Sequence, residues 1–239
     1  MTTIGVTFSS AKSAISFFHL AHLAEPRALH LSIQGIVTAQ EANSLATQIS
    51  KSSETLTDLY LTCNELAYSD VLSISHCHLL KSLKAPIRCS PNDIDHLAHG
   101  LPNLEILRLL DRTCDHKTYD YKLDLTCLSS LARHCKKLKR LTLPLDPSHV
   151  IPQSWESSRF SHLEYIRIIC RRFSESTGLA LFLSTISVKS LEVLGLRSER
   201  VTCDGWEEVR KLVPILQAAR REEREMVARS FNVTGQGSS

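Results

Sequence analysis

Histidines and cysteines are the first residues of this chain whose types and spacing could carry chemistry. The segments His76-Cys77-His78 and His96-x-x-His99 come nearest to a metal site, because a helix places residues three apart on one face. A closed zinc site needs four well-placed ligands, and the chain has no C-x-x-C pair to supply the others. We therefore expect no metal site and interpret these histidines as polar residues on the outside of helices.

Acidic residues and known catalytic motifs give no stronger signal. Lysines interrupt a run of aspartates that could otherwise suggest a cation site: Asp111, Asp115, Asp120 and Asp124. That run is better interpreted as a charged surface loop. The sequence has no H-E-x-x-H, no G-x-S-x-G and no glycine-rich phosphate loop. We expect no enzyme, no catalytic residue and no cofactor.

Composition narrows the class of protein further. Hydrophobic residues make up 43% of the 239 residues, which is enough for a packed core. Lysine and arginine number 28 against 25 aspartates and glutamates, a balance that disfavours a dedicated nucleic-acid binder. No run of roughly 18 uncharged apolar residues is present, so we expect no membrane-spanning helix and no membrane partner.

A pattern rich in leucine recurs along the chain and predicts the elements that position everything else. The pattern is L-x-x-L-x-L, with substitutions, and its copies begin at Met1, Pro26, Leu56, Leu80, Leu104, Leu138, Leu163 and Leu191. Its last two leucines have the period of a strand, so Leu59 and Leu61 should both face the core. Helical periodicity follows in the segments 41–49, 94–101, 123–135 and 176–186. We predict one strand and one helix per repeat, stacked with parallel strands.

The pattern resembles the leucine-rich-repeat family. One copy matches the family's L-x-x-L-x-L-x-x-N-x-L pattern in full, with Leu56, Leu59, Leu61, Asn64 and Leu66. Cys77 and Cys135 each lie three residues before a repeat leucine, which is similar to the cysteine-containing repeats of F-box/leucine-rich-repeat proteins. The resemblance implies an α/β fold: a leucine-rich-repeat solenoid (horseshoe) with strands on its concave face, helices on its convex face and a C-terminal capping helix.

The ends and insertions of this solenoid follow from the same pattern. We expect about eight repeats over 1–229, a helical cap at about 204–229 and a disordered tail at 230–239. Asp204 and Glu207 form a capping-box pattern, and Pro214 should kink the last helix or split it. Long insertions at 111–122 and 144–158 should form loops whose repeat boundaries stay open. No F-box is visible before the first repeat, so either a longer parent lost one, or a partner covers that end, or the first repeat pairs with itself.

The residues that alternate with the buried leucines should face the concave side. They carry five basic residues, and Asp58 is the one acid among them. Apolar neighbours are expected at Ile106, Leu110 and Ile169. Arginine and tyrosine among apolar residues are typical of interface hot spots. We predict a partner-binding surface that takes an acidic or phosphorylated protein segment and consists of Tyr60, Lys84, Arg108, Arg140, Tyr165, Arg167 and Arg197.

The resemblance and this surface lead to a function. The first hypothesis is the substrate-recognition part of an F-box-type ubiquitin ligase, whose partners are a protein substrate or an adaptor. The alternatives are a stand-alone leucine-rich-repeat scaffold unrelated to ubiquitin and, less favoured, a nucleic-acid-binding solenoid. His19 and His22 interrupt the apolar stretch 14–24, which disfavours a secretory signal and favours the cytoplasm or nucleus. The eight cysteines should then mostly be small, buried, reduced side chains.

Overall fold

The computed structural model describes residues 2–20, 26–64, 66–109, 123–145, 160–170, 176–186, 190–195 and 204–234. Its main feature is an eight-stranded sheet in which every neighbouring pair of strands is parallel. Its strands, in spatial order, are β1 (Thr3–Phe8), β2 (Ala28–Ile33), β3 (Asp58–Thr62), β5 (Ser82–Lys84), β7 (Ile106–Arg108), β8 (Arg140–Pro144), β9 (Tyr165–Cys170) and β10 (Ser190–Gly195). The spatial order is also the order along the chain, so the protein is α/β with an open, parallel sheet.

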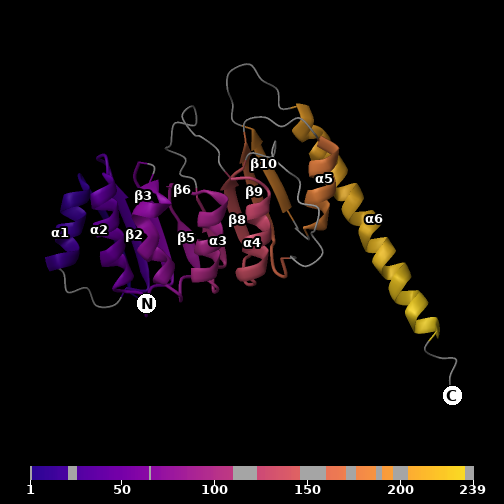
Figure 1. Cartoon of the computed structure of the whole chain (residues 1–239), viewed down its shortest axis with the longest axis horizontal. Helices are drawn as coiled ribbons and strands as arrows, with labels where there is room; N and C mark the ends of the chain where they lie inside the picture. The colour runs from indigo at the N-terminus through magenta and orange to yellow at the C-terminus, as the bar shows by residue number, and fades with distance from the viewer. Residues whose placement is uncertain are drawn as a thin grey trace.

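Helices between the strands lie in a row along one side of the sheet (Figure 1). They are α1 (Ala11–Leu20), α2 (Ala39–Ser50), the 3₁₀ helix η1 (Tyr68–His76), α3 (Pro91–Gly100), α4 (Thr126–His134) and α5 (Ser176–Thr185). The last helix, α6 (Asp204–Thr234), follows β10 and packs on α5. A second, two-stranded sheet pairs β4 (Leu66–Ala67) with β6 (Ile87–Arg88). The four helical segments predicted from periodicity are confirmed as α2, α3, α4 and α5, whereas α1 was not predicted.

Local sequence fixes where two of these helices begin. Thr38 precedes α2 and its hydroxyl accepts the N–H of Glu41, while the Glu41 carboxylate accepts the N–H of Thr38 at 3.0 Å. Ser90 and Asp93 form the same reciprocal capping box at the start of α3. Each box satisfies backbone donors that the first turn of a helix leaves without a partner. The helices therefore start at fixed points and turn their apolar faces towards the sheet.

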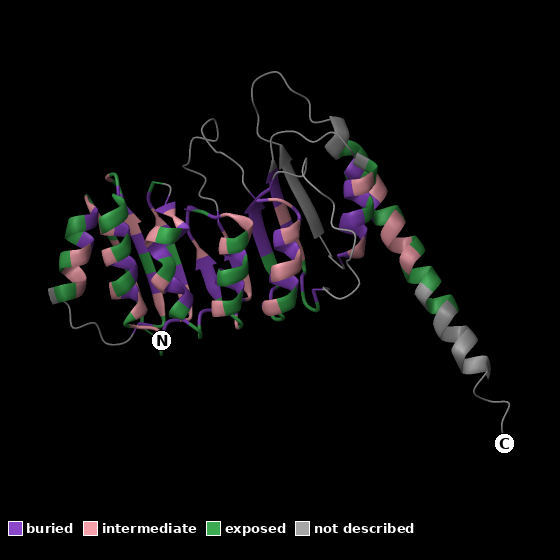
Figure 2. Ribbon diagram, viewed as in Figure 1, coloured by how far each residue is buried: buried purple, intermediate pink, exposed green. Residues whose placement is uncertain are grey.

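The core lies between the helices and the sheet, and Figure 2 shows its buried residues there. One residue from each of the eight strands pairs in a single ladder along the sheet. From β2 to β9 these residues are at most 1% exposed, and they are Leu29, Leu59, Leu83, Leu107, Leu141 and Ile166. Burying a leucine side chain contributes about 1.5–3 kcal/mol, so this ladder is a major source of stability.

The ends of three helices have the same geometry. Cys77 and Cys135 are the C-cap residues that directly follow η1 and α4, and Leu101 has the equivalent position after α3. The carbonyl of each accepts the N–H of a residue three positions later, at 2.9, 3.2 and 3.1 Å for Leu80, Leu104 and Leu138 respectively. A repeated sequence pattern therefore gives a repeated turn from helix into strand.

The cysteines act as buried apolar side chains. Cys63, Cys77, Cys89, Cys127 and Cys135 are free and buried, as predicted, and the side chains of the other three cysteines lie outside the described part of the chain. Burial raises the pKa of Cys77 to about 11 and that of Cys135 to about 12. The Cys135 thiol lies 3.6 Å from the carbonyl oxygens of both Ala98 and Leu101. These thiols pack between repeats and remain protonated at neutral pH.

The register of the last strand differs from the prediction. The pattern placed Leu194 opposite Ile166, but β10 pairs Leu191 with Ile166 and Leu194 with Ile169. Leu191 and Val193 also alternate, so the leucines of this segment fit two registers, and β10 has the one that begins closer to α5. A shift by an odd number of residues exchanges the two faces of a strand, so the register that placed Arg197 among the outward residues is wrong, and Arg197 itself lies outside the described residues.

The C-terminal helix is longer than expected. α6 runs through Pro214 as one helix, so of the two predicted effects of this residue, a kink or a split, the split is wrong. Val209 and Val213 are buried beside Pro214, and Gln217 donates to the Ile186 carbonyl at 3.1 Å, so packing on α5 holds both sides of the proline. The helix continues past the predicted boundary at 229 to Thr234, just before Gly235, a residue type that commonly ends helices. Residues 235–239 lie outside the described chain.

Candidate binding surface

The face of the sheet opposite the helices carries two rows of aligned residues, which we call the central row and the adjacent row. Strand pairing places in the central row Gly5, His30, Tyr60, Lys84, Arg108, Thr142, Arg167 and Glu192. The adjacent row contains Thr3, Ala28, Asp58, Ser82, Ile106, Arg140, Tyr165 and Ser190. Neighbouring members of a row stand one strand apart, about 4.8 Å.

The predicted binding residues therefore divide between the two rows. Tyr60, Lys84, Arg108 and Arg167 belong to the central row, and Arg140 and Tyr165 belong to the adjacent row, so they form a broad patch and not one ridge. Arg197 and Leu110 lie outside the described residues. The structure thus brings together six of the seven predicted residues across five successive strands.

A tyrosine ring contacts a basic side chain at each end of this patch. The Lys84 Nζ lies 5.9 Å from the centre of the Tyr60 ring, and Tyr60 also meets His30 edge to face at 5.8 Å. At the other end the Arg167 guanidinium lies 5.6 Å from the centre of the Tyr165 ring. Cation–π contacts of this kind contribute about 0.5–1 kcal/mol each at exposed sites. They restrict the long basic side chains to positions above the sheet.

Three arginines surround Thr142 in the middle of the patch. Thr142 pairs with Arg108 on one side and Arg167 on the other, and Arg140 lies two residues earlier on the same strand and the same face. Thr142 is only 8% exposed. Thr142 is therefore a short, buried side chain between two arginines of its own row.

Several residues expected to be accessible on this face are buried. Ser82, Thr142 and Ile169 are 6%, 8% and 6% exposed, and Pro144 is also buried. Pro144 and Ile169 pair with each other across β8 and β9. The corrected register of β10 pairs Glu192 with Arg167 along the backbone, and the side chains of β10 lie outside the described part of the chain.

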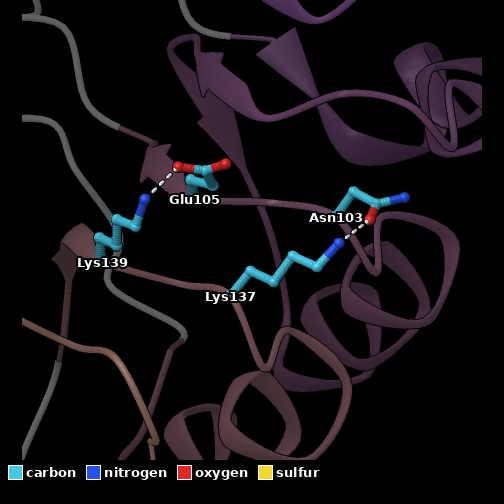
Figure 3. Close-up of polar contacts among 4 residues, drawn as sticks. All are labelled: Asn103, Glu105, Lys137 and Lys139. Carbon is cyan, nitrogen blue, oxygen red and sulfur yellow. Dashed lines mark hydrogen bonds and ion pairs between the residues drawn. The ribbon is translucent and has the colours of Figure 1, made fainter.

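A row of alternating charge runs along the edge where the strands begin, and it was not predicted. Its members each directly precede a strand and are Lys81, Glu105, Lys139 and Glu164. The Glu105 N–H donates to the Lys81 carbonyl at 2.7 Å, and the N–H groups of Lys139 and Glu164 donate to the carbonyls of Glu105 and Lys139 at 2.8 Å each. The Lys139 Nζ lies 2.7 Å from the Glu105 carboxylate (Figure 3). The hydrogen bond from Lys139 holds the pKa of Glu105 below its usual range. The opposite charges of Lys139 and Glu105 therefore compensate each other at this edge.

The same edge also ties successive turns together. The Asn103 side chain donates to the His78 carbonyl at 2.9 Å and accepts from the Lys137 Nζ at 2.7 Å (Figure 3). Beyond the ends of β2 and β3, the Asn64 Oδ1 accepts the Val37 N–H at 2.8 Å. These bonds link neighbouring repeats and fix the alignment of the rows. A sequence signal existed only for Asn64, which completes the repeat pattern.

The histidines that suggested a metal site have separate partners. The His96 Nδ1 hydrogen-bonds to the buried Tyr68 hydroxyl at 2.7 Å, and His99 meets His134 edge to face at 5.3 Å. Among the described residues, no three His, Cys, Asp or Glu side chains gather as metal ligands. The described helices also include none that is both long and apolar enough to cross a membrane.

Comparison with known proteins gives no relative for this chain. No protein-family model matches the sequence, and no curated protein matches it either.

Proposed function

We propose that this protein is a leucine-rich-repeat solenoid that works as a protein-interaction module. Three features support the repeat assignment: strands that add to the sheet in chain order, equivalent helix ends at Cys77 and Cys135, and the Asn64 bond to the preceding turn. In such a solenoid each repeat contacts its neighbours alone, and the strand face is the extended surface available to a partner. The patch on that face is therefore the proposed binding site.

The partner we propose is an acidic or phosphorylated protein segment. The single observation that carries this proposal is the grouping of Lys84, Arg108 and Arg167 in the central row with Arg140 in the adjacent row, over four successive strands of a chain with a net charge of only +3. Guanidinium groups bind carboxylates and phosphates through paired hydrogen bonds. An extended segment lying across the strands would meet a new row member about every 4.8 Å, and tyrosines at both ends would contact its apolar atoms.

The position above Thr142 is the one we propose for the strongest anion contact. The Cα atoms of Arg108 and Arg167 stand two strands apart, about 10 Å, with Thr142 between them. An oxyanion above Thr142 could accept hydrogen bonds from both guanidinium groups and from Arg140. Hydrogen bonds to charged groups contribute about 1.5–3 kcal/mol each, which makes this position the main source of affinity.

The cellular role we propose is substrate recognition for an F-box-type ubiquitin ligase. Its support is the cysteine-containing repeat, with Cys77 and Cys135 at equivalent helix ends. A stand-alone scaffold would use the same patch but would have no link to ubiquitin. Affinity purification of the native protein from cells distinguishes the two: recovery with a Skp-type adaptor supports the ligase, and recovery of other partners without that adaptor contradicts it.

The test of the binding surface uses charge reversal. Degenerate fluorescent peptide pools that are phosphoserine-containing, rich in aspartate and glutamate, or neutral are titrated with the wild type, Arg108→Glu and Arg167→Glu. We expect the acidic or phosphorylated pool to bind and each variant to weaken binding at least tenfold, about 1.4 kcal/mol. The matched control is Arg133→Glu, because Arg133 is exposed on α4 and makes the same change in net charge away from the sheet.

Equal binding by Arg108→Glu and Arg133→Glu would place any anion site elsewhere. A single-stranded RNA that bound better than the peptides, with a salt slope near −0.7 per phosphate contact, would support the nucleic-acid alternative and contradict a protein partner.

A further inference from the structure

The strand β1 is an open edge of the sheet. Within the described chain it pairs with β2 alone, so one side of its backbone has no strand beside it. Its sequence, Thr-Ile-Gly-Val-Thr-Phe, has no charge and no proline. Exposed edge strands normally carry such residues because they prevent pairing with other chains. β1 lacks these protective residues, which indicates that its free edge pairs with a strand of another chain.

The backbone hydrogen bonds show which groups of β1 face the free side. The carbonyls of Thr2 and Phe8 accept N–H groups from the β2 side, from Ala28 at 3.3 Å and from Gln34 at 3.0 Å. In a strand, the N–H and C=O of one residue point to the same side, and successive residues alternate. The even-numbered residues therefore face β2. The N–H and C=O groups of Thr3, Gly5 and Thr7 face the free edge.

The apolar core is also open at this end. Ile4, Val6 and Phe8 are only partly buried, although they pair with Leu29, Leu31 and Ile33, which are 0%, 2% and 5% exposed. The Phe8 ring lies 5.5 Å from that of Phe17 in α1, and Phe17 lies 6.0 Å from Phe18. Half-buried aromatic residues thus extend the core to the surface beside the unpaired backbone. A partner at this edge would gain both hydrogen bonds and apolar contacts.

The sequence of β1 identifies the partner that fits. It is nearly symmetric about Gly5: Ile4 and Val6 are β-branched residues on either side, and Thr3 and Thr7 lie beyond them. We propose that β1 pairs antiparallel with β1 of a second copy of this chain, with the two-fold axis at Gly5. Thr3 then lies opposite Thr7 of the second copy, Ile4 opposite Val6, and Gly5 opposite Gly5.

The alternating direction of the hydrogen-bonding groups along β1 agrees with a two-fold axis at Gly5. An antiparallel ladder alternates hydrogen-bonded and non-bonded pairs, and an axis at Gly5 pairs only Thr3, Gly5 and Thr7, the residues whose groups face outward. An axis between two residues would set an outward-facing residue opposite one whose groups bond to β2. An axis at Ile4 or Val6 keeps the alternation of the ladder, but it would set Thr3 opposite Gly5 or Gly5 opposite Thr7 and so lacks the symmetry of the sequence. A two-fold axis perpendicular to the sheet keeps the helices of both copies on the same side, so Ile4 and Val6 extend one continuous core. Cross-strand pairs of β-branched residues and threonines add about 0.2–1 kcal/mol each.

The test measures mass in solution for variants that act on the free edge alone. Gly5→Pro deletes an N–H that faces outward, so it leaves the bonds to β2 intact, and proline is tolerated on edge strands at such positions. Gly5→Ala is the matched control, because a Cβ there would meet nothing nearer than the His30 Cβ at 4.0 Å. By sedimentation, the wild type and Gly5→Ala should have twice the 26.8 kDa mass of one chain, and Gly5→Pro should have half the wild-type mass.

Hydrogen exchange of the wild type provides a readout that needs no variant. The amides of Thr3, Gly5 and Thr7 should exchange slowly in the dimer and faster on dilution, whereas the amides of Ile4 and Val6 should be protected in both states. A wild type that stays monomeric at about 100 μM overturns the proposal. A dimer in which the amides of Thr3 and Thr7 exchange freely also overturns it, because that dimer would use another surface.

Discussion

Truncation of one central leucine tests the packing on which the sheet depends. Leu107 is fully buried on β7 and pairs with Leu83 and Leu141 on the two neighbouring strands. Leu107→Ala removes the equivalent of about three CH₂ groups, worth about 0.8 kcal/mol each, or roughly 2.4 kcal/mol in transfer free energy. The two flanking strands limit collapse of the cavity, so the total loss in free energy of unfolding should be about 3–5 kcal/mol.

The assay is equilibrium unfolding in urea, followed by both circular dichroism and tryptophan fluorescence. The matched control is Leu79→Ala, because Leu79 is 46% exposed in the turn before β5 and should lose less than about 1 kcal/mol. If Leu107→Ala loses less than about 1 kcal/mol, or no more than Leu79→Ala does, the central ladder of leucines is not the core of this protein.

Three further predictions concern a close contact, a buried thiol and an ion pair. Gly100→Ala should lower the free energy of unfolding by about 1–3 kcal/mol in urea titrations, because a Cβ there would lie 2.5 Å from the Ser75 carbonyl oxygen. Cys135 should resist iodoacetamide at pH 8 in the native protein, as measured by peptide mass spectrometry, because burial raises its pKa to about 12. Glu105→Gln should be less stable than the wild type at pH 7, because the Lys139 hydrogen bond lowers the pKa of Glu105 in the folded state. That difference should disappear as the pH falls through the lowered pKa, where the carboxylate is protonated in both the folded and unfolded states.

Each of these predictions has a control and a contradicting result. Gly5→Ala, whose added Cβ makes only an ordinary contact with the His30 Cβ at 4.0 Å, should be neutral, and equal effects at the two glycines would refute the close contact at Gly100. Alkylation of Cys135 should become complete in denaturant, and rapid alkylation without denaturant would show that the thiol is accessible. A Glu105→Gln difference that did not change with pH would show that the ion pair with Lys139 does not stabilise the folded state.

The leucine pattern predicted most of the sheet because burial constrains it at every strand. Leu59, Leu83, Leu107, Leu141 and Ile166 lie in one ladder at the positions that the alternation indicated. A slip of one residue would expose every one of them, so the hydrophobic effect alone fixes the register. The outward-facing residues followed from the same argument, which is why the patch could be located from the sequence.

The register of β10 could not be obtained from leucine alternation alone, because its leucines fit two phases. Connection length does not decide between the two phases. The helices that end at His76, Gly100 and His134 are followed by strands that begin at Ser82, Ile106 and Arg140, but the connections from Leu20 to Ala28 and from Ser50 to Asp58 are longer. The strand after Thr185 begins at Ser190, and the start that the predicted register required would still have matched the longer connections.

The contacts within the patch could not be predicted from the sequence for a different reason. The stacking of Lys84 on Tyr60 and of Arg167 on Tyr165 depends on side-chain rotamers, which strand periodicity does not determine. The burial of Thr142 depends on the side chains of Arg108 and Arg167, which pair with it on the two neighbouring strands. The charge row that includes Lys139 and Glu105 lies just before the strands, where no alternation pattern applies.

The central claim is that the arginines around Thr142 bind an acidic or phosphorylated segment. The most direct measurement follows the side-chain Nε–Hε signals of Arg108, Arg140, Arg167 and Arg133 by NMR while a phosphoserine peptide pool is added. The claim predicts saturable shifts for the three arginines of the patch and none for Arg133 on α4. Shifts of equal size at Arg133, or none at the other three, would contradict it.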